Sequence, residues 1–426
     1  MGWLMRTADI ERVNDWVPGE LLAALRQAGG DREVHLVGGA LRDRLLGRPS
    51  PDLDLVANGR GEKLGRRLAR HLGGRFIALA GERFAAYRIV AGDLVVDLWG
   101  RGDTPIHDEL ERRDLTINSL AVDLAARRLL DPFGGVADLE RRRLRATSQR
   151  SFTEDPLRVL RLARFGASLA GFAVDPPTLE LARQAAARIN VVAAERIRDE
   201  VDRILAVRGR AAGAEILVDC GLYPSLWGGA GAATGADRVP PRLAAIGATR
   251  DELCAETDPE LCALSPTIVA HALLFSPPGG GFPAAAASSL LTRRARRQVS
   301  ALLELDELPM SGVDEIEGRW FLRRWRRRWL EAVVFAVLRP DPPAATDAEA
   351  ARSVAGLARR HGREIFDLPT LLDGHEIGRL LGLSPGPEIG RALLALEREQ
   401  IAGRVETAQA ARSFLLSERW RRESRP

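Results

Sequence analysis

The chain has 426 residues, enough for two to four domains at about 100–200 residues per domain. Its 46% hydrophobic and 28% charged residues are typical of a globular protein, and no apolar run reaches the roughly 18 residues of a membrane span. Three cysteines are too few for a disulfide scaffold, and the segment MGWLMRTADIERVND lacks the apolar core of a secretory signal. We therefore expect a cytoplasmic protein.

The basic residues are almost all arginines. Of the 62 basic residues only Lys63 is a lysine, although the net charge is just +4. A GC-rich genome explains part of this bias, but guanidinium groups also bind phosphate through two parallel hydrogen bonds. Composition does not separate the two explanations, so the positions of the arginines must.

Strand and helix patterns alternate in the first third of the chain. Residues 34–57 predict a strand, a Gly-Gly turn, a helix and a second strand. A helix is expected near 62–72, and further strands near 75–80, 84–90, 94–99 and within 119–131. Beyond about residue 150 the strand pattern disappears, and helices are predicted at 155–170, 176–188, 193–208 and 211–220. Low-complexity breaks lie at 228–241, 277–284 and 339–346.

Three aspartates of the head are candidates for metal binding. Asp52 and Asp54 lie two apart on a predicted strand, so their carboxylates point to the same face. Asp97, on a neighbouring predicted strand, can complete the set. Carboxylate oxygens suit Mg²⁺, and two-metal phosphoryl transfer needs such a cluster. Most isolated Asp-x-Asp pairs are solvated loops or caps, so the context decides.

That context is a Gly-Gly turn about ten residues upstream. Gly38 and Gly39 open a predicted helix, whose backbone N–H groups can approach a triphosphate. Arg42 lies on its first turn and can neutralise phosphate oxygens. A tight turn without a ligand is the alternative for the glycines, and Asp43 is expected to pair with an arginine.

Five motifs together resemble a known family. GGALRD followed by DLDLV resembles the nucleotidyltransferase signature of the tRNA CCA-adding enzyme and bacterial poly(A) polymerase family, class II branch. RRDLTINS (112–119), DPFGG (131–135), EDPLRVLRLARF (154–165) and AERIRDE (194–200) follow in the family's order. The resemblance implies an α+β fold, with a polymerase-β-like head containing a mixed sheet and an all-α remainder. The implied regions are a catalytic head (1–145), a base-recognising neck (146–225), a body (226–340) and a tRNA-binding tail (341–426).

The resemblance also implies roles for individual residues. Asp52 and Asp54 would hold Mg²⁺, with Asp97 as a third catalytic carboxylate. Nucleotide contacts would come from Gly38, Gly39, Arg42, Arg113, Asp114, Asn118, Asp155, Arg158, Arg161 and Arg164. Asp114 and Asn118, four apart, are expected on one helical face. Asp155 and Arg158, three apart on a helix, would hydrogen-bond the Watson–Crick edge of cytosine or adenine. Without the other motifs, Glu154 and Arg158 would form an ordinary surface ion pair.

The implied activity is addition of CCA, or part of it, to tRNA 3′ ends from CTP and ATP, without a membrane or stable protein partner. Residues 98–111 are shorter than the flexible loop of many relatives and lack its RRP-like element. This departure leaves a CC-adding specialist open. A poly(A) polymerase and a catalytically inactive RNA-binding homologue are further alternatives. A small-molecule nucleotidyltransferase would not need the long helical arm.

Three segments of the helical remainder allow narrower predictions. His271 lacks the adjacent aspartate of an HD phosphohydrolase and is expected to be a core residue. Residues 371–407 resemble the family's tail, where the turn PGPEIG either presents N–H groups to tRNA phosphates or is a structural cap. In RWFLRRWRRRWL (319–330) we expect the aromatic side chains to pack inward and the arginines to form an exposed stripe. This stripe either binds the RNA backbone or is the solvated face of an amphipathic helix.

Overall fold

The structure is a computed structural model. It describes residues 17–29, 32–48, 52–79, 86–227, 239–276, 287, 290–305, 308, 315–339, 348–417 and 420, with only the backbone of Asp52. The chain forms two compact units, Met1–Tyr223 and Pro224–Pro426. The segment MGWLMRTADIERVND and most of each low-complexity break lie outside the described residues.

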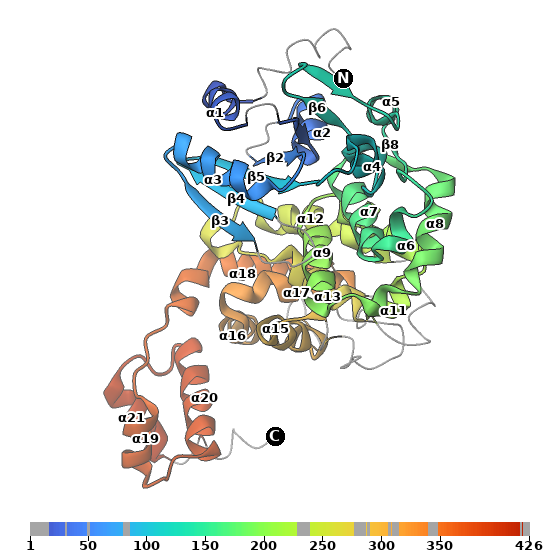
Figure 1. Ribbon diagram of the computed structural model, residues 1–426. Coiled ribbons are helices and arrows are strands. Elements are labelled where there is room, and N and C mark those ends of the chain that lie inside the picture. The colour runs from blue at the N-terminus through green and yellow to red at the C-terminus, as the bar shows by residue number, and fades with distance from the viewer. Residues whose placement is uncertain are drawn as a thin grey trace. The chain divides into compact units, whose positions relative to one another are not determined.

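A seven-stranded mixed sheet forms the centre of the first unit (Figure 1). Its strands are β1 (Val34–Val37), β2 (Asp52–Ala57), β3 (Arg75–Leu79), β4 (Ala86–Ala91), β5 (Leu94–Gly100), β6 (Ala121–Asp123) and β7 (Arg128–Leu130). The order is β3-β4-β5-β2-β1-β6-β7; β2 and β5 are parallel, and the other neighbours are antiparallel. This mixed sheet confirms the predicted α+β fold.

The two faces of the sheet are covered by different helices. Helix α3 (Gly61–His71) packs on β3, β4 and β5, and α1 (Gly19–Gly29) packs on α3. A Cβ added at Gly65 of α3 would meet Phe76 and Leu98, so α3 lies on the face to which Leu98 points. On the opposite face, Val37 and Val56 form a core with Leu110 of α4 (Ile106–Glu111). Because side chains alternate along a strand, this second face also carries Asp54 and Asp97.

Short elements connect the sheet to the helices that follow. They are α2 (Gly39–Leu45), η2 (Thr116–Asn118), α5 (Gly135–Glu140) and β8 (Arg143–Leu144). The next helices are α6 (Ser151–Glu154), α7 (Leu157–Ser168), α8 (Pro176–Ala186), η3 (Ile189–Val191), α9 (Ala194–Ala206) and α10 (Arg210–Asp219). The expectation that strands end near residue 150 is wrong in one place, because β9 (Ala173–Val174) pairs with β8. Helix α7 packs against α9 and α10, and its residues Leu160 and Leu162 are fully buried.

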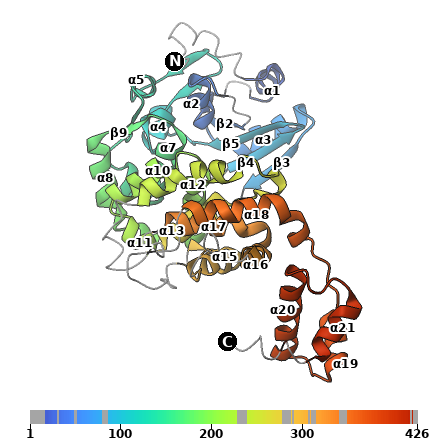
Figure 2. The same ribbon diagram turned by 180° about the vertical axis from the view of Figure 1, so that it is seen from behind.

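The described part of the second unit is helical (Figure 2). Helix α11 (Tyr223–Trp227) leads into it, followed by α12 (Val239–Cys254), η5 (Pro259–Leu261), α13 (Pro266–Leu274), α15 (Arg293–Leu303), α16 (Glu315–Trp325), η6 (Arg326–Arg328), α17 (Trp329–Leu338), α18 (Ala348–Phe366), α19 (Gly374–Leu381), α20 (Pro387–Ile401) and α21 (Ala408–Leu416). His271 on α13 is 1% exposed, as expected for a core histidine. The PGPEIG segment (385–390) spans the start of α20, with Gly386 as the N-cap and Pro387 as the first helical residue.

The arginine-rich segment 319–330 is only partly as predicted. Phe321, Trp325 and Trp329 are buried, but the helix is interrupted after Trp325 by η6, where Arg326 has a positive φ of 48°. Arg323 is also buried and pairs with Glu397 at 2.6 Å. The expectation of an exposed stripe is therefore wrong for Arg323, because a carboxylate from α20 and carbonyls at the end of α18 hold its guanidinium inside.

No helix within the described ranges is long and apolar enough to cross a bilayer.

Candidate functional site

The candidate carboxylates lie on the two parallel strands at the centre of the sheet. In the register of β2 with β5, Asp54 is paired with Asp97, and Asp52 with Val95. Paired residues on neighbouring strands point to the same face, and Asp52 and Asp54 share a face because they are two apart. The backbone thus carries all three aspartates to one face of the sheet.

Arg88 on β4 holds Asp97, a contact that sequence analysis missed. Its Nε donates to Oδ1 and its Nη2 to Oδ2, both at 2.7 Å. The register places Arg88 directly opposite Asp97, so the two side chains share a face. Alternation along β4 is the signal that could have found this pair.

Gly38 lies where the turn, the carboxylates and an arginine converge. Its φ is 81°, in the region that favours glycine. A Cβ at this position would lie 2.8 Å from Oδ2 of Asp54 and 3.2 Å from Nη1 of Arg113. The missing side chain thus allows close approach of the backbone to Asp54, and Gly39 then begins α2.

Arg113 is enclosed next to this turn. Its guanidinium lies 5.6 Å from the ring centroid of Trp99, and its Nη2 lies 3.9 Å from a carboxylate oxygen of Glu109. Burial lowers the pKa of Arg113, and the nearby carboxylates of Glu109 and Asp54 oppose that shift. Trp99 in turn donates to Glu109 at 3.3 Å. Arg113 is thereby fixed beside the carboxylates, in a pocket where its charge is little screened by water.

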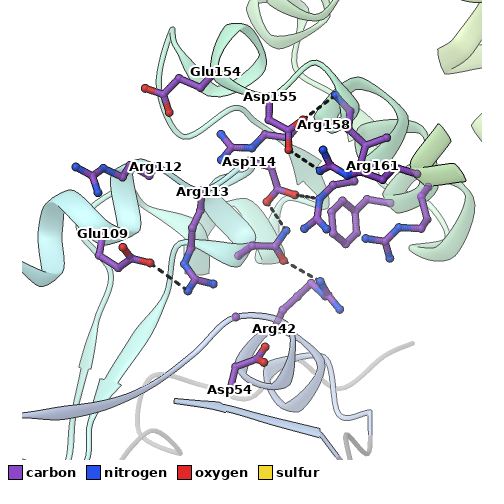
Figure 3. A pocket seen from close by; sticks show the side chains of 17 residues that line it. Arg42, Asp54, Glu109, Arg112, Arg113, Asp114, Glu154, Asp155, Arg158 and Arg161 are labelled. Atoms are coloured by element: carbon purple, nitrogen blue, oxygen red, sulfur yellow. Dashed lines mark hydrogen bonds and ion pairs between the residues drawn. The ribbon is translucent and has the colours of Figure 1, made fainter. Parts of the chain in front are cut away.

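A chain of hydrogen bonds joins α2 to α7 (Figure 3). Arg42 donates to Oδ1 of Asn118 at 2.8 Å, Asn118 donates to Oδ1 of Asp114 at 2.8 Å, and Nε of Arg161 donates to Oδ2 of Asp114 at 2.7 Å. Burial would raise the pKa of Asp114, but Arg161 and the hydrogen bonds from Asn118 and the Leu115 N–H lower it to about 2. The carboxylate of Asp114 therefore stays ionised and orders its neighbours.

The prediction that Asp114 and Asn118 lie on one face of a helix is wrong, although their side chains do meet. Asp114 precedes η2 and is not helical, and Leu115 is extended with φ −127°. The two side chains meet because the chain turns tightly, not because of a 3.6-residue repeat. Asp43 pairs with Arg42 at 2.9 Å, as expected.

Asp138, a residue that the sequence motifs did not indicate, stabilises the turn at 114–118 through a hydrogen bond. Its buried carboxylate accepts from Thr116 at 2.6 Å and from Nε of Arg143 and Arg145 at 2.6 and 2.8 Å. The DPFGG motif leads into the same place, because Asp131 accepts from the first N–H groups of α5, on which Asp138 lies.

Asp155 lies outside the helix on which we expected it. It is extended, with φ −142° and ψ 100°, because the following Pro156 disfavours a helical conformation. Its Oδ1 accepts from the Leu157 N–H at 3.1 Å, and its Oδ2 accepts from Arg196 of α9 at 3.1 Å. Arg196, from the AERIRDE motif, thus fixes the plane of this carboxylate.

Arg158 begins the arginine face of α7. It donates to the Ser151 carbonyl at 2.8 Å, whereas Glu154 lies near Arg150 instead. The ordinary Glu154–Arg158 ion pair is therefore not formed.

Arg161 and Arg164 follow Arg158 along α7 and surround a phenylalanine. Arg164 donates to Glu200 of α9 at 2.7 Å, and burial lowers the pKa of Arg164 while Glu200 opposes the shift. The Phe165 ring lies within 6 Å of the guanidinium carbons of Arg42, Arg161 and Arg164. Phe165 is the last residue of the motif EDPLRVLRLARF, but the spacing of that motif did not indicate a contact between Phe165 and Arg42 of α2.

These side chains line one pocket of about 880 Å³ in the first unit, within the usual range for ligand sites. Figure 3 shows Arg42 and Asp54 on one side of the pocket, Asp155 and Arg158 on the other, and Asp114 between them. The predicted residues that line it are Gly38, Gly39, Arg42, Asp54, Arg113, Asp114, Asn118, Asp155, Arg158, Arg161 and Arg164. Asp97 is not among the described residues that line it, and the side chain of Asp52 lies outside the described part of the chain. Glu109, Arg112, Phe165 and Arg196 line it too and were missed.

Known families and relatives match long parts of this chain. Residues 34–98 and 100–145 match the model of the poly A polymerase head domain, and residues 171–227 match that of the probable RNA- and SrmB-binding site of polymerase A. The CC-adding tRNA nucleotidyltransferase of Geobacter sulfurreducens is 34% identical, over 93% of this chain and 94% of the relative.

The chain belongs to the tRNA nucleotidyltransferase and poly(A) polymerase family. Another relative in this family, the A-adding tRNA nucleotidyltransferase of Deinococcus radiodurans, is 32% identical over 91% of this chain and 96% of its own length. The fold of this family member is similar to the Thermotoga maritima CCA-adding enzyme solved in complex with tRNA. The TM-score is 0.66 at 18% identity, over 97% of this chain and 98% of that one.

Proposed function

We propose that this enzyme extends the 3′ end of tRNA with CCA, or part of it, from CTP and ATP without a nucleic-acid template. The observation that carries the proposal is a single pocket lined by a sheet carboxylate, Asp54, and by the arginines of α2 and α7. Nucleotidyl transfer needs these two kinds of group together: carboxylates near the reacting phosphate and cations along the triphosphate.

The triphosphate lies against α2 and the 112–118 segment in this proposal. Arg42 and Arg113 neutralise the phosphate oxygens, and the Gly38–Gly39 backbone approaches them closely because no Cβ intervenes. Both arginines are held by other side chains, so little reorganisation is needed when charge develops on the leaving pyrophosphate.

The base lies against the other side of the pocket. A carboxylate accepts from the exocyclic amino group of cytosine or adenine, and a guanidinium donates to the ring acceptors. Asp155 and Arg158 supply these two groups, and both are already anchored, Asp155 by Arg196 and Arg158 by the Ser151 carbonyl. The protein would thus act as the template.

The carboxylates suit Mg²⁺. No group of three His, Cys, Asp or Glu side chains is clustered for a metal among the side chains that the structure describes, which do not include Asp52. The donor chemistry nevertheless fits, because the register carries Asp52, Asp54 and Asp97 to one face and hard oxygen ligands are those that Mg²⁺ prefers. In the proposal Asp52 and Asp54 would hold the ion, which when bound would polarise the α-phosphate. Asp97 orients the attacking 3′-hydroxyl and accepts its proton.

A CC-adding specialist is the second candidate. Only residues 98–111 separate Asp97 from Arg112, and part of this connection is the short helix α4 packed on the sheet. A connection tied down in this way has little freedom to reshape the pocket for adenine. The relative from Geobacter sulfurreducens is named as CC-adding, which favours the same outcome, whereas the one from Deinococcus radiodurans is named as A-adding.

The test is to incubate the purified protein with tRNA lacking CCA, or ending in C or CC, and labelled CTP or ATP. We expect incorporation of C, and A on the CC end only if all three additions are supported. Long adenylate tails without use of CTP would instead indicate a poly(A) polymerase.

The variant Asp52→Ala together with Asp54→Ala should abolish addition while tRNA binding stays within about twofold of wild type. Incorporation by the variant near the wild-type rate would overturn the carboxylate assignment. Loss of tRNA binding together with activity would indicate misfolding, which a thermal unfolding curve checks.

A further inference from the structure

The ring of Phe165 lies at the centre of the arginine cluster. It is 3% exposed, and the guanidinium carbons of Arg164, Arg42 and Arg161 lie 4.5, 5.1 and 5.8 Å from its centroid. Arg161 and Arg164 come from the same helix as Phe165, but Arg42 comes from α2. One ring is thus the shared neighbour of cations from both sides of the pocket.

Each of these arginines is also anchored by hydrogen bonds. Arg161 uses Nε toward Asp114, and Arg164 uses Nε toward Glu200. Arg161 and Arg164 donate to the described residues through Nε alone, so their terminal Nη groups remain for a ligand. Arg42 is held more fully, by Asp43 and Asn118.

Three guanidinium groups around one ring repel one another in a half-buried pocket, where water screens charge weakly. An additional carboxylate would offset this repulsion, but it would occupy the N–H groups that a phosphate needs. An aromatic ring attracts cations through its negative face and takes no hydrogen-bond donor. A phenylalanine therefore holds the cluster together and leaves the Nη groups of Arg161 and Arg164 available.

We infer that Phe165 is a positioning residue that pre-organises Arg42, Arg161 and Arg164 for binding of the nucleoside triphosphate. It acts through the arginines and does not itself contact the reacting atoms. The inference rests on the proposed function, since it takes a nucleoside triphosphate as the ligand of the pocket.

The experiment replaces Phe165 in the full chain with phenylalanines carrying one to five ring fluorines. Fluorination weakens the negative face of the ring stepwise while its shape changes little. We expect the dissociation constant for CTP, measured by calorimetry in magnesium buffer, to rise with each fluorine. The rise at five fluorines should be roughly five- to thirtyfold. KM for CTP should follow while kcat changes less than about twofold.

Phe76 provides a matched control. Its ring lies 4.5 Å from the guanidinium of Arg66 and contributes nothing to the lining of the pocket. The same fluorinated series at Phe76 should leave CTP binding unchanged. A second variant, Phe165→Leu, keeps an apolar side chain and removes the ring, and it should weaken CTP binding at least as much as five fluorines do. Thermal unfolding of each protein separates weakened binding from lost folding.

Unchanged CTP affinity across the Phe165 series would overturn the inference, since it would show that the carboxylates alone hold the arginines. Equal weakening by the Phe76 series would also overturn it. Failure of the unmodified protein to bind either CTP or ATP would instead overturn the proposed function, and the inference with it.

Discussion

The two units of the chain both carry many arginines but use them differently. In the second unit, Arg352 of α18 lies 3.8 Å from Glu252, Arg359 pairs with Glu256, and Arg363 pairs with Asp258. Each of these arginines is more than 40% exposed and meets an acid from the stretch 252–258. Such exposed pairs contribute little to stability, because water screens them and two long side chains must be ordered.

In the first unit the arginines converge on a pocket. Arg161 and Arg164 meet carboxylates that are 4% and 6% exposed, and they do so through Nε alone. The acids here hold the arginines in place without covering their outer nitrogens. What distinguishes a ligand site from a solvated basic surface is therefore which nitrogens the neighbouring acids occupy, not how many arginines are present.

Among the substitutions that separate the two units, Arg161→Ala is expected to have the largest effect on the free energy of unfolding. This change leaves the buried carboxylate of Asp114 without its charged partner, and removal of one member of such a pair typically destabilises by several kcal/mol. Because Arg161 is partly exposed and Asp114 keeps two other hydrogen bonds, we expect a loss of about 2–3 kcal/mol in the free energy of unfolding. Urea denaturation measures it.

The matched control is Arg359→Ala in the second unit, which should change the free energy of unfolding by less than about 1 kcal/mol. Nucleotide affinity should fall about tenfold or more for Arg161→Ala, from the loss of a charged hydrogen bond, and stay the same for Arg359→Ala. Equal effects of the two changes on either quantity would remove the distinction between the two regions.

A smaller effect is expected from Asn118→Ala, which interrupts the path from Arg42 to Asp114 without removing a charge. Both partners of Asn118 keep other contacts, Arg42 with Asp43 and Asp114 with Arg161. We expect a loss of about 1–2 kcal/mol in stability and a rise of roughly threefold to tenfold in KM for CTP. Steady-state kinetics with tRNA at saturation check this, and an unchanged KM would show that Asn118 does not position Arg42.

Much of the first unit was predictable because its signals are local. Alternation placed Asp52 and Asp54 on one face of a strand, and the Gly-Gly turn indicated the start of α2. These two features depend on residues close together in sequence, where periodicity and turn chemistry are informative. The mixed sheet followed by helices was instead implied by the resemblance of the five motifs to a known family.

Contacts across long stretches of sequence were not predictable. Arg196 lies 41 residues from Asp155, and Arg42 lies 76 residues from Asn118, so no spacing rule connects them. Helical spacing gave two wrong predictions in this region, and in each a particular residue explains the difference. Asp155 is extended because Pro156 follows it, and residues 114–118 form a tight turn that a hydrogen bond to Asp138 stabilises.

A pH series tests whether the buried carboxylate of Asp114 stays ionised. The pKa of Asp114 is lowered to about 2, below its ordinary value of about 3.9. A lowered pKa gives stability that is fully present above the ordinary value and is lost as the pH falls toward the folded value. Asp114→Asn should therefore reduce the free energy of unfolding by a constant amount between about pH 5 and pH 8. Urea unfolding of both proteins at several pH values measures the difference. A difference that narrows as the pH falls within this range would mean that Asp114 titrates there, and that Arg161 does not hold it ionised.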